Sequence, residues 1–232
     1  MRFLIVLVAS LAMAVPAMGE QMRQITVTGE GRVDAAPDMA TISLGVVTEG
    51  KTAAEAMAAN SERVSAMLKQ LSAAGIEDRD MQTSNLNINP RMDHNSSSTR
   101  SGPIVIGFVA SNTLTVRMRD LATMGGTLDS VLESGANQFH GLSFGFQDPQ
   151  PHQDDARRRA VEDARRKAEL YAEAAGVTLG NVMTISEHGR ASPQPMMMME
   201  ASMARGADVP IASGEVTTQA NVTIVYELVG GE

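Results

Sequence analysis

Apolar and polar residues alternate at every second position over much of this chain, and this pattern restricts its fold more than any other feature. The alternation runs through residues 25–33 and again through residues 40–46, and a period of two indicates strands with one buried face. Pro37 and Asp38 lie between these segments and favour a turn, so we expect a hairpin there. Further strands are expected at residues 84–88, 104–118, 142–146, 182–187 and 216–228. A chain with these strands must build sheets whose apolar faces are covered by other elements.

Helical periodicity separates the strands in three places. Thr52 and Glu55 form a capping-box motif, and apolar residues recur behind them at helical spacing until Gly75, which suits a helix end. A second helix is expected over residues 121–132 and a third over residues 153–175. Alanine recurs along the third helix at positions 156, 160, 164, 168, 172 and 175. Because methyl groups are small, this stripe would let the helix backbone approach a sheet closely.

The order of these elements predicts an α+β fold. Residues 38–148 read as β-α-β-β-α-β, which is the order of a ferredoxin-like unit with two helices on one face of an antiparallel sheet. The first strand, the third helix and the last two strands remain, and they must form a second sheet-and-helix layer. The predicted organisation is therefore a ferredoxin-like subdomain at 38–148, with residues 20–37 and 149–232 as the second layer.

The first nineteen residues have the pattern of a secretory signal peptide. Arg2 is their only charged residue, residues 3–14 are almost wholly apolar, and Ala17-Met18-Gly19 ends the segment with small residues, as cleavage sites do. Twelve residues rise only ~18 Å as a helix, which is short of the ~30 Å hydrocarbon core. We therefore expect cleavage after Gly19, a mature domain at 20–232 without a membrane span, and a periplasmic location. Free protein and association with the outer membrane stay open as alternatives.

Charge and cysteine content exclude several classes of function. The chain has 19 basic and 27 acidic residues, a formal net charge of −8, no cysteine and 3% aromatic residues. An acidic surface without aromatic platforms does not suit nucleic acid, so no nucleic-acid partner is expected. The absence of cysteine excludes disulfides, thiolate metal sites and cysteine nucleophiles.

One short segment matches a hydrolase motif. Residues 141–145 read Gly-Leu-Ser-Phe-Gly, the pattern in which a serine is raised on a sharp turn from strand to helix. Here the pattern lies inside an alternating segment that continues to Phe146, so Ser143 is expected on a strand. A hydrolase acting through Ser143 is kept only as a third hypothesis.

The remaining polar candidates have structural explanations. His140 shares the apolar phase of Leu142 and is expected to be buried and hydrogen-bonded, whereas His94 and His188 are expected in loops. Asp34 and Asp38 flank a turn, where capping of the local backbone is the expected role rather than acid-base catalysis. The histidines, which include His152, do not show the spacing of a zinc site. We therefore predict no enzyme and no cofactor.

A cluster of methionines is the most unusual local feature. Met196, Met197, Met198, Met199 and Met203 place five thioethers within eight residues. Thioethers are soft ligands that suit Cu(I), and they are oxidised reversibly to sulfoxides. Copper binding, sacrificial oxidation and a merely tolerated flexible insertion remain as three interpretations.

Several segments together resemble a known family. They are Val27-Thr28-Gly29-Glu30-Gly31-Arg32-Val33 with Pro37-Asp38 and Ala40, then Asp80-Met81-Gln82-Thr83, Gly107-Phe108, Arg119-Asp120-Leu121, Asp148-Pro149, and the alanine-striped helix. In this order they resemble the SIMPL-domain family, and the resemblance spans nearly all of the predicted mature chain. It implies an α+β envelope protein that self-assembles and is associated with stress tolerance and antigenicity, with no catalytic residues to transfer. Met92, where an aromatic residue is expected, and the methionine cluster depart from the family pattern.

We therefore predict a non-enzymatic periplasmic protein that acts through homo-oligomer assembly and surface binding, with a role in oxidative-stress defence. The alternative is a copper-handling or oxidant-quenching protein that acts through Met196–Met199 and Met203. The sequence does not identify a protein partner.

Overall fold

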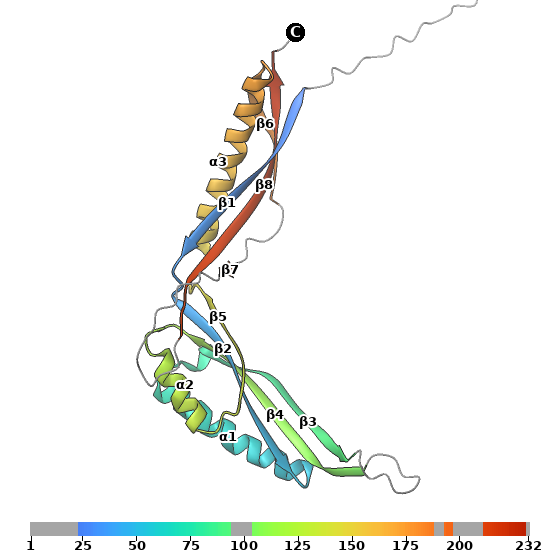
Figure 1. Ribbon diagram of the computed structural model, residues 1–232, viewed down its shortest axis with the longest axis vertical. Helices are drawn as coiled ribbons and strands as arrows, with labels where there is room; N and C mark the ends of the chain where they lie inside the picture. Colours follow the sequence, from blue (N-terminus) through green and yellow to red (C-terminus); the bar gives the residue numbers. More distant parts are fainter. Residues whose placement is uncertain (1–22, 94–103, 188–192, 197–210, 231–232) are drawn as a thin grey trace, which may run out of the picture.

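The computed structural model describes residues 23–93, 104–187, 193–196 and 211–230. Two antiparallel sheets lie end to end and give the molecule an elongated, bent shape (Figure 1). We call them the upper and lower sheets, as Figure 1 is drawn. The predicted signal peptide lies outside the described residues. No helix within the described ranges has the length and apolar character needed to cross a bilayer.

The lower sheet has the order β3-β4-β2-β5 and carries helices on one face (Figure 1). Its elements are β2 (Met39–Gly50), α1 (Ala53–Ala73), the short 3-10 helix η1 (Asp78–Asp80), β3 (Met81–Asp93), β4 (Ile104–Met118), α2 (Met124–Glu133) and β5 (Gln138–Gly145). Apart from the small η1, this is the predicted ferredoxin-like succession, and all its neighbouring strands pair antiparallel.

The upper sheet has the order β1-β8-β6, and α3 packs against β1 and β8. Its elements are β1 (Gln24–Ala35), α3 (Gln150–Ala174), β6 (Thr178–Glu187), β7 (Pro193–Met196) and β8 (Glu215–Val229). The predicted second layer is therefore confirmed. The structure adds the short strand β7, which the alternation did not predict and which pairs with the start of β8. The proposed boundary between residues 38–148 and the rest stays a prediction.

The ends of α1 form as their residues predict. The N–H of Glu55 donates to Thr52 Oγ1 at 3.2 Å, and the Glu55 carboxylate accepts from the N–H of Thr52 in return. Gly75 has φ +88°, a conformation in which a side chain would be strained, and Ile76 donates to the carbonyl of Leu71 at 3.0 Å. These contacts fix where the helix begins and ends.

Helix α3 lies unusually close to β1. Its buried stripe consists of Ala156, Ala160, Ala164, Ala168 and Ala172. Gly29 and Gly31 of β1 face this stripe, and a Cβ placed on Gly31 would lie 1.9 Å from the carbonyl oxygen of Ala156. Any side chain at Gly31 would therefore collide with the helix backbone. The alanine stripe acts as predicted, except that Ala175 lies just beyond the end of α3 and is exposed. The two strand glycines complete the close contact.

Side chains of α3 also occupy the free edge of β1. Lys167 Nζ donates to the carbonyl of Thr28 at 2.9 Å, the N–H of Glu30 donates to Asp163 Oδ2 at 3.0 Å, and Arg159 donates to the carbonyl of Arg32 at 2.8 Å. These three backbone groups belong to every second residue of β1, so they lie on the same edge of the strand. The helix thus satisfies groups with which another strand could otherwise pair.

The core of the lower sheet contains a polar side chain that the hydrophobic pattern did not indicate. Asn60 lies on α1, is almost completely buried, and donates from Nδ2 to the carbonyls of Val46 at 2.9 Å and Ala110 at 3.2 Å. These carbonyls belong to β2 and β4. Asn60 therefore ties α1 to the two central strands of the lower sheet.

Candidate functional site

A cavity of about 340 Å³ lies in the lower half, beside the junction of the two sheets. It is lined by the end of α1, by η1, by the end of β4 and by the segment that leads into α2, including Ile76, Glu77, Asp80, Arg119 and Thr123. The residues that line it include no histidine, serine or cysteine. Any chemistry in this cavity would depend on its carboxylates and arginines.

Asp80 and Arg119 form the central ion pair of this site. Arg119 donates from Nε to Asp80 Oδ2 at 2.6 Å and from its terminal nitrogen to Oδ1 at 2.8 Å. The Asp80 side chain is only 3% exposed, whereas that of Arg119 is 39% exposed. The hydrogen bonds from Arg119 lower the pKa of Asp80, against the opposing effect of burial. Asp80 therefore stays ionised at neutral pH and does not suit the role of a general acid.

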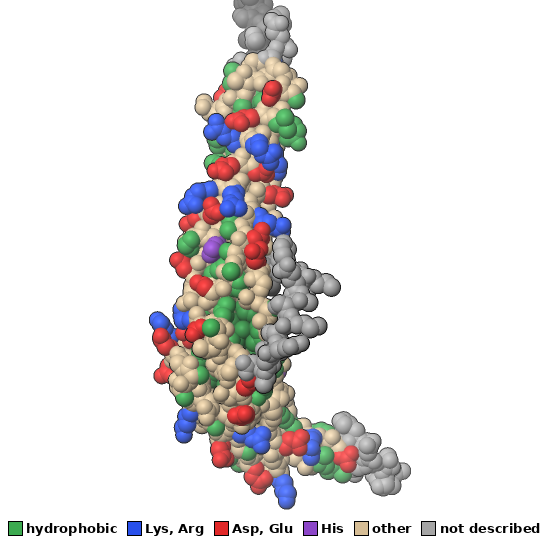
Figure 2. Space-filling view, turned by 60° about the vertical axis from the view of Figure 1, so that its left-hand side comes forward, with side chains coloured by type: hydrophobic (Ala, Val, Ile, Leu, Met, Phe, Trp, Pro, Cys, Tyr) green, Lys and Arg blue, Asp and Glu red, His purple; other side chains and the backbone are tan. Residues whose placement is uncertain are grey.

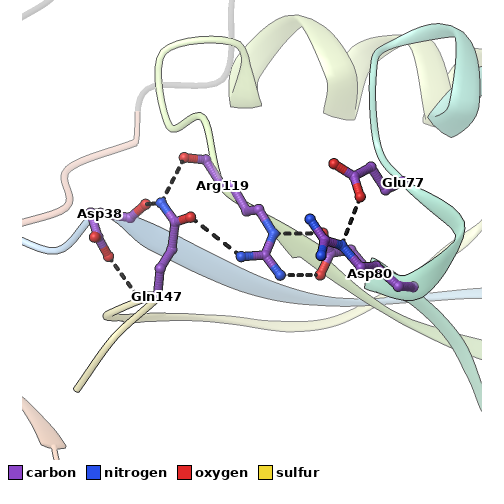
Figure 3. A network of polar contacts seen from close by, with 6 residues as sticks. Asp38, Glu77, Asp80, Arg119 and Gln147 are labelled. Atoms are coloured by element: carbon purple, nitrogen blue, oxygen red, sulfur yellow. Dashed lines mark hydrogen bonds and ion pairs between the residues drawn. The ribbon is translucent and has the colours of Figure 1, made fainter. Parts of the chain in front are cut away.

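Gln147 connects this ion pair to Asp38, which lies in the segment between β1 and β2, as Figure 3 shows. Its Oε1 accepts from Arg119 at 3.3 Å and its Nε2 donates to the carbonyl of Asp38 at 3.0 Å. The Asp38 carboxylate in turn accepts from the N–H of Gln147 at 2.7 Å. Asp38 lies where β1 passes into β2, and Gln147 lies where β5 passes into α3. The network therefore links two of the chain segments that connect the halves.

The arrangement suits a structural role. The Asp80 carboxylate and the Arg119 guanidinium form a bidentate ion pair, which is strong and directional. Catalysis by acid and base needs a group that can gain or lose a proton near the working pH, and Asp80 is held away from that condition. The residues of this network explain how the two connecting segments are fixed to the lower half better than they explain a reaction.

Ser143 lies on β5, as the strand prediction requires. It pairs opposite Thr41, and its hydroxyl donates to the Thr41 carbonyl at 3.5 Å. The residue is exposed on a strand that continues to Gly145, so it does not occupy the turn from strand to helix that the hydrolase motif needs. The hydrolase hypothesis has no support from this geometry.

The prediction for His140 was wrong. His140 is exposed, because Ser43 pairs with Gly141 and Leu44 pairs with Phe139, which leaves His140 as the extra residue of a β-bulge. A bulge reverses the inward and outward phase of a strand, and the apolar period alone does not reveal it. His152 stacks on Phe146 with ring centroids 4.0 Å apart.

The other predicted candidates are only partly described. Asp34 accepts from the hydroxyl of Thr217 at 2.5 Å, so it binds across the sheet and not within the turn. Met196 ends β7 opposite Glu215. Four methionines of the cluster and two histidines lie outside the described residues: Met197, Met198, Met199, Met203, His94 and His188. Among the described side chains, no group of three or more His, Asp or Glu residues is placed to hold a metal ion.

The sequence analysis did not predict the polar network around Arg119, although it had singled out several of the residues involved. Arg119 and Asp80 are 39 positions apart, so local periodicity contains no information about their contact. Asp38 was expected to cap the local backbone of the turn, but the backbone N–H that it binds is that of Gln147, 109 positions away. The signal that could have found them is the position of each residue at the end of a predicted element.

The fold defines a two-sheet α+β protein in which a polar network surrounds Arg119 at the end of the lower sheet. The chain belongs to the SIMPL family, described as a protein of unknown function (DUF541), whose model matches residues 25–226. It is 41% identical over 218 residues to the 26 kDa periplasmic immunogenic protein of Brucella melitensis, with 91% of this chain and 87% of that protein covered. It is 29% identical over 242 residues to the uncharacterized protein YggE of Escherichia coli strain K12, covering 98% of this chain and 94% of that protein. The protein is periplasmic, as its relatives of known location are.

Proposed function

We propose that this protein is a non-catalytic periplasmic component that acts by assembling with copies of itself and by binding through its exposed sheet surfaces. One observation carries the proposal: large apolar side chains are exposed on the outer strands β3 and β6 and at the start of β4. They are Leu86, Ile88, Ile104, Val105, Ile106, Val182 and Ile185. Clustered apolar surface of this kind is typical of sites that contact other proteins.

The position of these side chains follows from how the helices cover the sheets. Helix α1 packs mainly on β2 and β4, and α3 packs mainly on β1 and β8. The outer strands β3 and β6 are therefore left largely uncovered by the helix of their own sheet. By contrast, acidic and basic side chains are mixed along the face that carries α3 (Figure 2), which is typical of a solvated surface.

Sedimentation velocity on the chain without residues 1–19 tests self-assembly. We expect a concentration-dependent species larger than the monomer, and a double variant with Ile106→Ser and Ile185→Ser should shift it towards monomer. Leu132→Ser is the matched control, because Leu132 is exposed to 47% on α2, away from both outer strands. A wild-type chain that remains monomeric at micromolar concentration would contradict the proposal.

We also propose a role in oxidative-stress defence, which is supported by the family resemblance. It predicts that cells lacking the protein survive peroxide less well and that the wild-type chain restores survival. If the assembly-deficient double variant restores survival equally, protection does not depend on assembly.

A second candidate function, copper handling or oxidant quenching, is supported by the five closely spaced methionines. Titration of Cu(I) into the wild type and into a variant with Met196–Met199 and Met203 changed to leucine tests it. Leucine preserves the apolar volume and removes the thioether ligand. Equal Cu(I) affinity, together with equal sensitivity of the two chains to peroxide, would remove this candidate.

A further inference from the structure

Strand β3 forms an open edge of the lower sheet. It pairs with β4 on one side only, and each residue from Gln82 to Met92 is exposed. Figure 1 shows β3 along the outer border of the lower sheet. Residues 82–89 contain no charged side chain and no proline, although charge and proline are the usual means by which an edge strand prevents pairing.

The other three sheet edges are each obstructed. The free edge of β1 is bonded by Lys167, Asp163 and Arg159 of α3. Strand β6 shifts register twice against β8, and β5 is short and contains a bulge. Bulges distort the regular spacing of backbone donors and acceptors that a new strand would need. Strand β3 also has two register shifts, but its run Asn85–Arg91 between them is regular.

The pattern within this regular run is symmetric. It reads Asn85-Leu86-Asn87-Ile88-Asn89, so asparagines and branched apolar residues alternate equally on both sides of Asn87. Leu86 and Ile88 are 54% and 37% exposed and share the face of Ala110, which is on the side of α1. On the other face, Asn89 Nδ2 donates to Asn87 Oδ1 at 2.8 Å.

We propose that two copies of this chain pair antiparallel through their β3 edges, with Asn87 on the two-fold axis. This inference deepens the proposed self-assembly by naming its surface. In this register Leu86 faces Ile88 of the other copy, so apolar residues meet apolar residues. Asn85 faces the second copy's Asn89, and Asn87 faces its equivalent. An isologous contact requires a self-complementary surface, and the symmetry of this run about Asn87 provides one.

The symmetry is the reason for assigning a second copy to this edge and not an unrelated peptide. Pairing with an unrelated peptide would not require residues 85–89 to be symmetric about Asn87. The −8 net charge of the chain opposes association at long range, but the contacting run is uncharged, and salt screens charges over about 8 Å at physiological ionic strength.

Disulfide trapping tests this register, since the chain has no cysteine of its own. Asn87→Cys should form a disulfide-linked dimer when the protein is treated with diamide. Gln82→Cys is the matched control: it is exposed on the same strand, but the register places it opposite Met92 of the other copy. The inference also predicts that a mixture of Asn85→Cys and Asn89→Cys chains gives the mixed dimer in excess over either homodimer.

Asn87→Lys provides a second measurement that does not depend on oxidation. It places two like charges against each other on the axis, and we expect the pairing affinity measured by sedimentation to fall at least about tenfold. Circular dichroism should be unchanged, because Asn87 is exposed.

Three outcomes are distinguishable. Trapping at Asn87 without trapping at Gln82, with weaker pairing of Asn87→Lys, supports the inference. A chain that assembles normally but shows neither effect overturns the β3 interface and leaves self-assembly intact. A chain that is monomeric in sedimentation overturns both.

Discussion

Replacement of Gly31 by alanine should destabilise the upper sheet strongly, because α3 leaves no space for a methyl group. The new Cβ would lie 1.9 Å from the Ala156 carbonyl oxygen and 2.6 Å from the Ala160 nitrogen. A relaxed contact needs ~3.5 Å, so α3 and β1 must separate by roughly 1.5 Å. Both obstructing atoms belong to the helix backbone and cannot rotate away. Overpacking costs ~1–3 kcal/mol, and we expect a loss of about 3 kcal/mol.

Urea unfolding followed by tyrosine fluorescence measures this effect selectively. The chain has two tyrosines, Tyr171 on α3 and Tyr226 on β8, and both lie in the upper half. For a slope of ~2–3 kcal/mol per molar urea, a loss of about 3 kcal/mol lowers the midpoint by roughly 1–1.5 M. Circular dichroism reports on both halves. If the lower half unfolds separately, it should give a second transition at the same urea concentration as in the wild type. Such a transition would support the proposed boundary between residues 38–148 and the rest.

Gly126→Ala is the control for this experiment. A Cβ at Gly126 meets nothing within 4 Å, and the residue lies inside α2. Gly126 lies in the first turn of α2. Alanine is favoured over glycine by at most ~0.5–1 kcal/mol within a helix, so this variant should be at least as stable as the wild type. A Gly31→Ala chain that unfolds at the wild-type urea concentration would refute the close approach of α3 to β1.

Three further changes test the polar contacts by urea unfolding at several pH values. Lys167, followed by the N–H of Glu30, lowers the pKa of Asp163 from 3.8 to about 2. Asp163→Asn should therefore cost about 1–2 kcal/mol at pH 7, after allowance for partial exposure, and this difference should vanish as the pH falls from about 4 to 2. Arg119→Met leaves the buried carboxylate of Asp80 unpaired, so the variant should be less stable at neutral pH and approach the wild type in acid, where that carboxylate is neutralised; a gap independent of pH would contradict this explanation. Asn60→Asp points a carboxylate at two carbonyl oxygens and should cost about 2 kcal/mol or more at pH 7, with partial recovery on acidification.

The sequence predicted the succession of elements because that succession follows local rules. The capping box at Thr52, the helix end at Gly75 and the alanine stripe of α3 are each encoded within a few residues. The ferredoxin-like order of the lower half then follows from the order of strands and helices along the chain. These predictions needed no information about contacts between distant residues.

The rest of the structure depends on contacts that local pattern does not contain. The bulge at His140 is a change in pairing between two strands, so its exposure does not follow from the apolar phase of β5 alone. The pair between Asp80 and Arg119 joins elements 39 positions apart. Asn60 interrupts an apolar helix face, and its role becomes visible only when the carbonyls of β2 and β4 lie opposite.

Alternation alone does not distinguish the free edges of the two sheets, but the residue composition of the edge strands does. Alternation predicted both β1 and β3 as strands with equal force. Yet β1 contains glycines that let α3 approach, and charged residues of α3 bind its edge. Strand β3 contains asparagines and branched residues without a charge over residues 82–89. An edge strand that lacks charge, proline and a covering helix lacks the features that prevent pairing. The absence of these features over residues 82–89 of β3, beside the three contacts that occupy the edge of β1, favours this part of β3 as the edge through which the protein pairs with a second copy.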